Sequence, residues 1–174
     1  PDYNPRIGIE STTGPLGQGI ANAVGMAIAE TMLAAKFNRT GFNVVDHRTY
    51  AICGDGCMME GISSEACSLA GTLKLSKLTV LYDDNGISIE GETDLAFREN
   101  VGARFEAYGW QVVRVEDGND YAQVVEGIAK TFGDERPSLV ICPTVIGYGS
   151  VAKQGKASAH GEPLGADEIA LVKK

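Results

Sequence analysis

The chain has 174 residues, of which 44% are hydrophobic and 22% charged, a balance typical of globular proteins that excludes a disordered or collagen-like chain. Fifteen Lys and Arg against twenty-three Asp and Glu give a formal net charge of −8, and no run rich in Lys or Arg occurs, so we expect no nucleic-acid partner. Because no apolar run of about 18 residues and no secretory leader is apparent, we expect no membrane partner and a cytoplasmic protein.

The four cysteines predict reduced thiols rather than a disulfide framework. Cys53, Cys57, Cys67 and Cys142 lie in apolar or helix-like stretches, and no two of them form a C-x-x-C pair. Only two histidines are present to complete a zinc site. Mostly buried, reduced thiols are typical of a cytoplasmic protein.

The first predicted element is a helix over residues 20–37, a stretch rich in Gly and Ala. Thr12 or Thr13 is expected to cap it, with Pro15 in its first turn, where proline is tolerated. Small side chains let another backbone come close, so we expect this helix to be fully buried at a subunit or domain contact. An ordinary alanine-rich core helix is the alternative.

Apolar, β-branched runs then alternate with segments of helical periodicity. This alternation predicts an α/β fold, a parallel sheet with helices on both faces, in a single domain over residues 1–174. After residue 145 we expect a loop rich in Gly, Ser and Ala and a short helix from Ala166. The predicted strands are 49–53, 78–82, 111–115 and 138–142, and the predicted helices between them are 59–73, 95–108 and 121–132.

Gly54-Asp55-Gly56 lies between the first predicted strand and the helix after it. Glycine lets a backbone approach a ligand closely, and free N–H groups in such a turn attract an anion. The Asp55 carboxylate would repel a diphosphate unless a cation lay between them. The motif therefore indicates a metal-bridged diphosphate, although Gly and Asp are also the commonest turn residues.

Asn85 strengthens this interpretation. It follows the second predicted strand and lies thirty positions after Asp55 (85 − 55), the length of a β-α-β unit. Both side chains are therefore expected at the carboxyl ends of successive parallel strands, where open α/β sheets bind ligands. A carboxylate, an amide and a nearby carbonyl suit Mg²⁺ or Ca²⁺.

Gly54-Asp55-Gly56 with the downstream Asn85 resembles the thiamine diphosphate motif, and the surrounding sequence closely resembles the transketolase family. The resemblance covers essentially the whole chain and implies the thiamine diphosphate-binding fold, in the later part of the family's diphosphate-binding domain. The matching blocks are residues 12–19 (TTGPLGQG), 54–63 (GDGCMMEGIS), 68–71 (SLAG), 82–89 (YDDNGISI), 104–110 (RFEAYGW) and 160–161 (HG).

The resemblance implies a role for particular residues. The metal ligands would be the side chains of Asp55 and Asn85 and the backbone carbonyl of Ile87. The residues that bind thiamine diphosphate would include Asn85 and His160 together with Gly14, Pro15, Leu16 and the N–H of Gly56. Gly14 and Pro15 have a simpler alternative as the start of a helix.

Three residues would act in catalysis according to the resemblance. His160 matches a histidine at the diphosphate and the incoming sugar. Glu60 and Glu65 match acids near a dimer contact that are proposed to relay protons between two active sites. A carboxylate in the first turn of a helix, such as Glu60, is also favoured by the helix dipole alone.

The implied activity is transfer of a two-carbon ketol unit from a ketose phosphate to an aldose phosphate, with thiamine diphosphate and Mg²⁺ or Ca²⁺. The family's pyrimidine-binding domain is absent from this chain, so we expect it in trans, within a homodimer or heterotetramer that binds sugar phosphates. The alternatives are a dihydroxyacetone synthase-type ketol transferase and a non-catalytic cofactor-binding or assembly module. Residues 90–100 and 155–159 depart from the sequence that is usual in the family, which puts the substrate contacts of these two segments in doubt.

Overall fold

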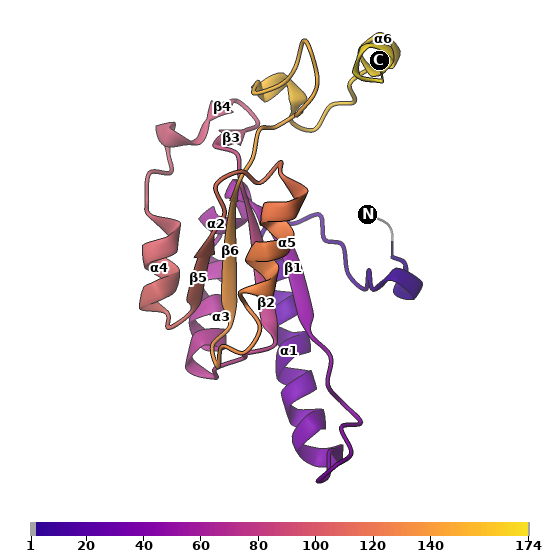
Figure 1. Ribbon diagram of the computed structural model, residues 1–174. Coiled ribbons are helices and arrows are strands. Elements are labelled where there is room, and N and C mark those ends of the chain that lie inside the picture. The colour runs from indigo at the N-terminus through magenta and orange to yellow at the C-terminus, as the bar shows by residue number, and fades with distance from the viewer. Residues whose placement is uncertain (1–2, 174) are drawn as a thin grey trace.

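The computed structural model describes residues 3–173, and its centre is a four-stranded parallel sheet (Figure 1). The strand order is β1-β2-β6-β5, so the first two strands are neighbours, as the β-α-β spacing predicts. The strands are β1 (Thr49–Gly54), β2 (Leu78–Asp84), β5 (Gln111–Arg114) and β6 (Ser138–Pro143). All four predicted strands are confirmed, with ends that differ by one or two residues.

Helices cover both faces of this sheet, as predicted. Figure 1 shows α5 in front of the sheet and α1 and α3 behind it. Alternate residues of β6 point to opposite sides: Leu139 and Ile141 join the larger core cluster, while Val140 and Cys142 join a smaller one. The helices are α1 (Gln18–Phe37), α2 (Asp55–Met59), α3 (Gly61–Thr72), α4 (Val101–Ala107) and α5 (Tyr121–Ala129).

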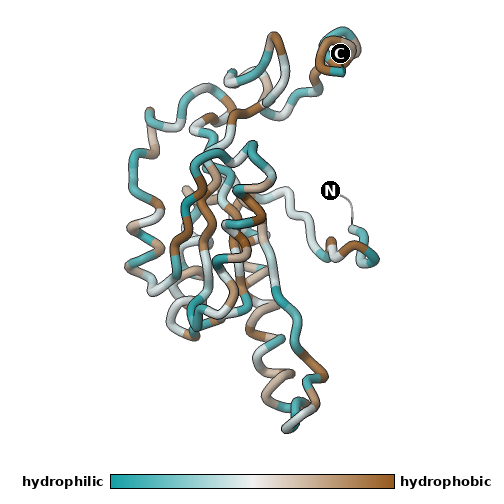
Figure 2. Tube along the Cα trace, in the orientation of Figure 1, coloured by the Kyte–Doolittle hydropathy of each residue, from teal (hydrophilic) through white to brown (hydrophobic). Residues whose placement is uncertain are grey.

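Hydrophobic residues are concentrated along the strands in Figure 2, and the larger cluster lies between them and α1, α3 and α4. Trp110 and Phe105 anchor it edge-to-face, with ring centroids 5.0 Å apart. All four cysteines are free thiols, and three of them are buried, which confirms that prediction.

Short elements surround the carboxyl end of the sheet and the two chain ends. The antiparallel pair β3–β4 follows β2 directly, and the C-terminal segment extends away from the sheet beyond β6 (Figure 1). These elements are η1 (Pro5–Ile7), β3 (Ile87–Ser88), β4 (Gly91–Glu92), η2 (Thr93–Leu95), η3 (Ala157–Ala159) and α6 (Ala166–Val172).

Three predicted helices are shorter or more broken than expected, and the one predicted over 121–132 ends at Ala129. The helix predicted over 59–73 is interrupted at Glu60, whose extended backbone (φ −77°, ψ 136°) separates α2 from α3. The helix predicted over 95–108 begins only at residue 101, because the Asn100 side chain accepts a hydrogen bond from the Ala103 amide and caps α4 there.

Helix α1 begins two residues before its predicted start, but its predicted cap and first-turn proline are wrong. Thr12, Thr13 and Pro15 all lie before the helix, which begins directly after Gly17 with no side-chain cap. Gly17 has a left-handed backbone (φ +78°), and a Cβ there would lie 2.8 Å from the Ser63 Oγ. Glycine is therefore required at this position both by the backbone conformation and by the close approach of α3.

Helix α1 is not fully buried in this chain. Its buried residues are Ile20, Ala23, Val24, Ala27 and Glu30, whereas residues on the opposite side, such as Met32, are exposed. Contrary to the expectation from sequence, its twenty residues are long and apolar enough to cross a membrane by length and composition alone. Packing against β1 and α3 provides another reason for this apolar character, that of a core helix.

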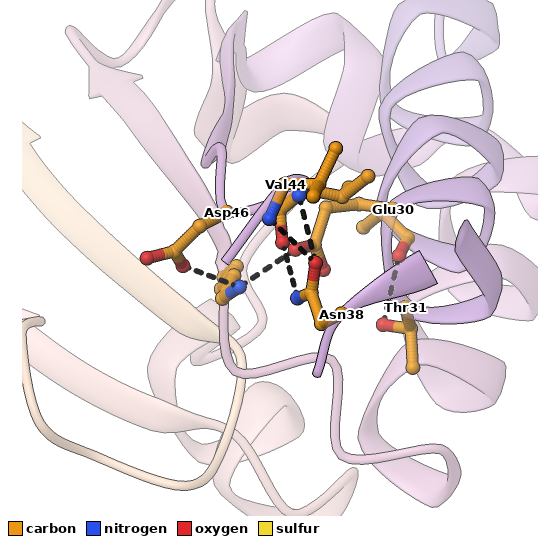
Figure 3. Close-up of polar contacts among 8 residues, drawn as sticks. Glu30, Thr31, Asn38, Val44 and Asp46 are labelled. Carbon is orange, nitrogen blue, oxygen red and sulfur yellow. Dashed lines mark hydrogen bonds and ion pairs between the residues drawn. The ribbon is translucent and has the colours of Figure 1, made fainter. Parts of the chain in front are cut away.

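The connection from α1 to β1 is held by the side chain of Asn38 (Figure 3). Its Oδ1 accepts hydrogen bonds from the amides of Val44 and Val45 at 2.8 and 2.9 Å, and its Nδ2 donates to the Val45 carbonyl at 2.8 Å. The Asn38 amide therefore ties the end of α1 to the backbone of Val44 and Val45, ahead of β1.

A buried carboxylate fastens the same region to β2. Glu30 is 3% exposed, and Glu30 and Asp46, both labelled in Figure 3, each pair with the Lys77 ammonium, at 2.6 and 2.7 Å. Burial alone would lower the pKa of Lys77, but the hydrogen bonds to Asp46 and Glu30 outweigh it and raise that pKa. Lys77 therefore stays charged and links α1, the loop and the start of β2.

Replacing Lys77 by Met tests this link. Glu30 would keep its buried carboxylate without a cationic partner, and we expect the free energy of unfolding to fall by about 2–3 kcal/mol. This is less than a fully buried pair would lose, because 31% of the Lys77 side chain is exposed. Urea unfolding of the chain measures it, and Lys77→Met with Glu30→Gln should recover part of the loss. Equal urea midpoints for Lys77→Met and the unsubstituted chain would contradict the account.

Candidate functional site

The candidate site lies where β1 and β2 end side by side. Gly54 at the end of β1 is in register with Asp83 near the end of β2, and α2 begins at the next residue, Asp55. The loop after β2 carries Asn85. The predicted position of Asp55 and Asn85 at the carboxyl ends of neighbouring parallel strands is therefore what the structure has.

The Asp55 carboxylate is buried, with 4% of the residue exposed, and both of its oxygens accept hydrogen bonds. The Tyr82 hydroxyl donates to Oδ1, and the Gly86 amide donates to Oδ2 at 3.1 Å. Burial raises the pKa of Asp55, while the hydrogen bond from Tyr82 opposes that shift. Since Gly86 lies between Asn85 and Ile87, its hydrogen bond brings the carboxylate to the segment that carries both other predicted ligands.

The orientation of the Asn85 amide is set by its neighbours. Its Oδ1 accepts from the Ile87 amide at 2.9 Å, and its Nδ2 donates to Asp83 Oδ1 at 3.4 Å. Thr144, which follows β6, donates its hydroxyl proton to the same Asp83 oxygen. The amide oxygen is therefore turned toward the β3 side of the loop and its nitrogen toward Asp83.

These donors fit a hard divalent cation. A carboxylate, an amide oxygen and a backbone carbonyl are oxygen ligands that Mg²⁺ and Ca²⁺ prefer, and one or two protein carboxylates leave positions for phosphate oxygens and water. Within residues 3–173, no group of three or more His, Cys, Asp and Glu is arranged to hold a metal. Asp55, Asn85 and Ile87 carry oxygen donors of these three kinds at this edge of the sheet.

Two of the residues predicted to bind the cofactor, Gly56 and Leu16, lie next to this set. Gly56 follows Asp55 in α2, and a Cβ on it would lie 3.0 Å from Leu16 Cδ1. Leu16 belongs to the segment before α1 and is half exposed. Gly14 and Pro15 in the same segment are exposed as well. The structure thus brings the 14–16 segment against the Gly56 turn, with apolar surface open to a ligand.

A cavity of about 430 Å³ adjoins the Asn85 loop. Asn85, Gly86 and Ile87 line one side of it, and residues of the segment after β6, among them Thr144 and Gly155, line another. The site is therefore open toward the loop that carries His160.

His160, Glu60 and Glu65 are not gathered with Asp55. All three are exposed, and His160 follows η3, where its amide donates to the Ala157 carbonyl at 2.8 Å. Glu60 precedes α3 as its N-cap residue and does not lie in the first turn, as the sequence suggested, because the chain is extended there. The helix dipole of α3 still favours a carboxylate at this position, although the Glu60 side chain makes no capping hydrogen bond.

The sequence did not identify Tyr82, Asp83 and Thr144 as residues of the site. Tyr82 had a signal: it alternates with Leu78 and Val80 and so faces the same core as they do. Burial, and after it the Asp55 carboxylate, raise the pKa of the Tyr82 phenol, so that it remains a hydrogen-bond donor. Thr144 gave no signal, since it meets Asp83 across 61 positions of the sequence.

Comparison with known proteins places these features in a family. Residues 1–174 match the family described as transketolase, thiamine diphosphate binding domain. Transketolase 1 of Escherichia coli is 57% identical over 175 aligned residues, which cover 100% of this chain and 26% of that protein. The chain spans about a quarter of the length of the curated relatives it matches.

Solved structures indicate the same family. A transketolase from Leishmania mexicana superposes with a TM-score of 0.92 at 52% identity and covers 95% of this chain and 25% of its own. A transketolase from Pichia stipitis in complex with sedoheptulose-7-phosphate has a TM-score of 0.90 at 49% identity, covering 93% of this chain and 24% of its own.

The loop that carries His160 is fastened by Glu168 of α6. Glu168 Oε1 accepts hydrogen bonds from the buried Ser150 hydroxyl at 2.5 Å and from the Ala152 amide at 2.9 Å. Lys153 also donates to the Pro163 carbonyl at 2.9 Å. The Ser150 hydroxyl, followed by the Ala152 amide, holds the pKa of Glu168 below its ordinary value of 4.5.

This anchor should depend on pH. Because the folded-state pKa of Glu168 is depressed, its contribution is present above 4.5 and is lost as the pH falls through the lower folded-state value. We expect the Ala152 amide to lose hydrogen-exchange protection on acidification, and Glu168→Ala, which removes both acceptor oxygens, to lose it at neutral pH.

Asp167→Asn on the same helix is the matched control and should keep the protection of the Ala152 amide at neutral pH. The amides of β6 report whether the whole fold has opened at low pH. Full protection of Ala152 in Glu168→Ala at neutral pH would show that the carboxylate does not hold the loop.

Proposed function

The chain belongs to the transketolase family, in its thiamine diphosphate-binding domain, and from this premise we propose that it is the diphosphate-binding part of an enzyme that transfers a two-carbon ketol unit. The donor would be a ketose phosphate and the acceptor an aldose phosphate. The observation that carries the proposal is the convergence of Asp55 with the Asn85–Ile87 segment at the end of β1 and β2.

The proposed substrate class is taken from the solved structure of a relative. The Pichia stipitis transketolase is described in complex with sedoheptulose-7-phosphate, a ketose phosphate. We propose a ketose phosphate of this kind as the donor, with His160 on the loop beside the cavity at the sugar. A pyrimidine-binding domain, in another part of the polypeptide or in another chain, would complete the site, and we propose that the protein acts in the cytoplasm.

The residues of this chain would hold the cofactor through its diphosphate. Asp55 and Asn85 would bind Mg²⁺ or Ca²⁺ through their side chains and Ile87 through its carbonyl, with the Gly56 amide directed to the diphosphate. The segment Gly14, Pro15 and Leu16 would cover the cofactor beside Gly56. Thiamine diphosphate, when bound, supplies the nucleophilic carbon for ketol transfer.

A cation is needed for electrostatic reasons. Asp55, Asp83 and Asp84 lie close enough together that the latter two raise the pKa of Asp55, after burial. A diphosphate brought to this edge without a cation would add further negative charge. The divalent ion would neutralise both, and the buried Asp55 carboxylate, already held by two donors, would be ready to bind it.

A hybrid protein gives the test a complete enzyme. In it, this chain replaces the matching quarter of the Escherichia coli transketolase 1 to which it is 57% identical. We expect the hybrid to convert xylulose 5-phosphate and ribose 5-phosphate, and formaldehyde in place of ribose 5-phosphate tests for a dihydroxyacetone synthase. A folded hybrid without ketol transfer would support the non-catalytic alternative instead.

Asp55→Asn in the hybrid should abolish Mg²⁺-dependent binding of thiamine diphosphate, because the only carboxylate of the ligand set is lost. Asparagine is preferred to alanine, which would leave the Tyr82 hydroxyl and the Gly86 amide unpaired. Asn85→Ala should weaken binding less, since a neutral amide contributes less to cation binding than a carboxylate. Calorimetric titration of cofactor at fixed Mg²⁺ measures both.

Asp167→Asn, an exposed carboxylate on α6, is the control and should bind cofactor normally. Unchanged cofactor affinity in Asp55→Asn would refute the proposed metal site.

The exposed sides of α1 and α3 support assembly with another chain. Met32, Leu33 and Phe37 of α1 are exposed, as are Leu69 and Leu73 of α3, and the two helices pack against each other. Exposed apolar surface of this extent is typical of an interface. We propose that it is covered in a homodimer or heterotetramer, with Glu60 and Glu65 of the same region near the contact, where they would relay protons between two sites.

Gly25→Leu tests this interface. Gly25 is exposed on α1, and a Cβ there would meet no atom within 4 Å, so the crowding expected from sequence is not present within the chain. We therefore expect the fold to tolerate leucine and the assembly to weaken by about 1–3 kcal/mol through overpacking. Sedimentation of the hybrid measures the dissociation constant. Ala122→Leu on α5, an exposed position on the opposite face of the sheet, is the control, and an unsubstituted hybrid that sediments as a monomer would contradict the proposal.

A further inference from the structure

We propose that Tyr82 is a positioning residue for the metal site: its buried hydroxyl holds the Asp55 carboxylate in the orientation that binds the cation. The proposal rests on the proposed function, in which Asp55 is a metal ligand. It assigns a role to the hydroxyl alone, because the ring has a separate role in packing.

Tyr82 connects the core to the site. The residue is 3% exposed, and its ring belongs to the larger hydrophobic cluster between the sheet and α1–α3. Tyr82 on β2 pairs in register with Cys53 of β1, which lies two residues before Asp55. The Tyr82 side chain therefore lies next to the turn from β1 into α2. The only polar atom of the side chain thus reaches the carboxylate from the apolar interior.

The two donors to Asp55 come from different parts of the chain. Tyr82 on β2 donates to Oδ1, and Gly86 in the loop after β2 donates to Oδ2. With both oxygens held, rotation of the carboxylate about its Cβ–Cγ bond breaks at least one hydrogen bond. Without the hydroxyl, only the Gly86 amide would remain to fix the orientation of the carboxylate.

These hydrogen bonds leave room for a metal. An ionised carboxylate has about four acceptor positions on its two oxygens, and Tyr82 and Gly86 use one on each. The remaining positions are free to coordinate a cation. The hydroxyl therefore orients the ligand and does not compete with the metal.

Asp55, Tyr82 and Asp84 line the same cavity, so the Asp84 carboxylate lies near both partners of this hydrogen bond. Without the hydroxyl, Asp55 would lose the donor that holds its Oδ1, and repulsion from Asp84 would favour turning Asp55 away from its present orientation. Partners of this kind, which contact the ligand and not the metal, typically change metal affinity by about 10–100-fold.

Tyr82→Phe in the hybrid tests the proposal, because it removes the hydroxyl and keeps the ring. We expect the dissociation constant for Mg²⁺, titrated calorimetrically at saturating thiamine diphosphate, to rise by about 10-fold or more. The metal-free protein should still unfold cooperatively, at a temperature lowered only by the loss of one donor to the buried Asp55 carboxylate, since the ring packing is retained. Raising the Mg²⁺ concentration should restore kcat, which loss of the fold would not allow.

Tyr108→Phe is the matched control. Tyr108 packs in the same core, with its ring 5.7 Å from that of Phe105, and within residues 3–173 its hydroxyl makes no hydrogen bond. It should bind Mg²⁺ as the unsubstituted hybrid does.

The outcomes separate the two proposals. If the unsubstituted hybrid shows no Mg²⁺-dependent cofactor binding, the proposed function fails. If it binds and Tyr82→Phe has the same Mg²⁺ affinity, the role of Tyr82 is refuted while the proposed function stands. A Tyr82→Phe protein that loses stability together with affinity, and that excess Mg²⁺ does not rescue, likewise refutes the positioning role, since the residue would then be structural.

Discussion

Burial of the Asp55 carboxylate at the joint end of β1 and β2 is the constraint on which the rest of the site depends. A carboxylate that is 4% exposed loses its hydration and needs donors inside the fold. The Tyr82 hydroxyl and the Gly86 amide provide them, and both belong to β2 or the loop directly after it. The parallel pairing of β1 with β2 therefore has to be in its observed register for the carboxylate to be satisfied.

The same edge of the sheet collects negative charge. Asp83 and Asp84 end β2, and the structure satisfies Asp83 through the Thr144 hydroxyl and the Asn85 amide, which are neutral donors. By contrast, the buried Glu30 at the other end of the sheet is paired with the Lys77 cation. An edge with several carboxylates held by neutral groups retains its attraction for a cation, whereas a carboxylate paired with lysine does not.

The parallel sheet, its neighbouring strands and the meeting of Asp55 with the Asn85 loop could be predicted from the sequence, because strand periodicity and a thirty-residue spacing are local signals. The break at Glu60 could not, since it depends on Ser63 folding back to the Cys57 carbonyl at 2.6 Å. Tyr82 and Thr144 were missed because their partners are 27 and 61 positions away. Helix α1 was expected to be fully buried and is buried on one side only, because the spacing of small residues does not tell which of them face a neighbour in the same chain.

The most direct test of the metal and diphosphate site is a crystal structure of the hybrid with thiamine diphosphate and Mn²⁺ in place of Mg²⁺, located by anomalous scattering. The account predicts one strong peak within about 2.5 Å of an Asp55 carboxylate oxygen, the Asn85 amide oxygen and the Ile87 carbonyl oxygen, as expected for oxygen-ligated cations. A cofactor-bound crystal whose manganese lies on Asp83 and Asp84, away from Asp55, would contradict it.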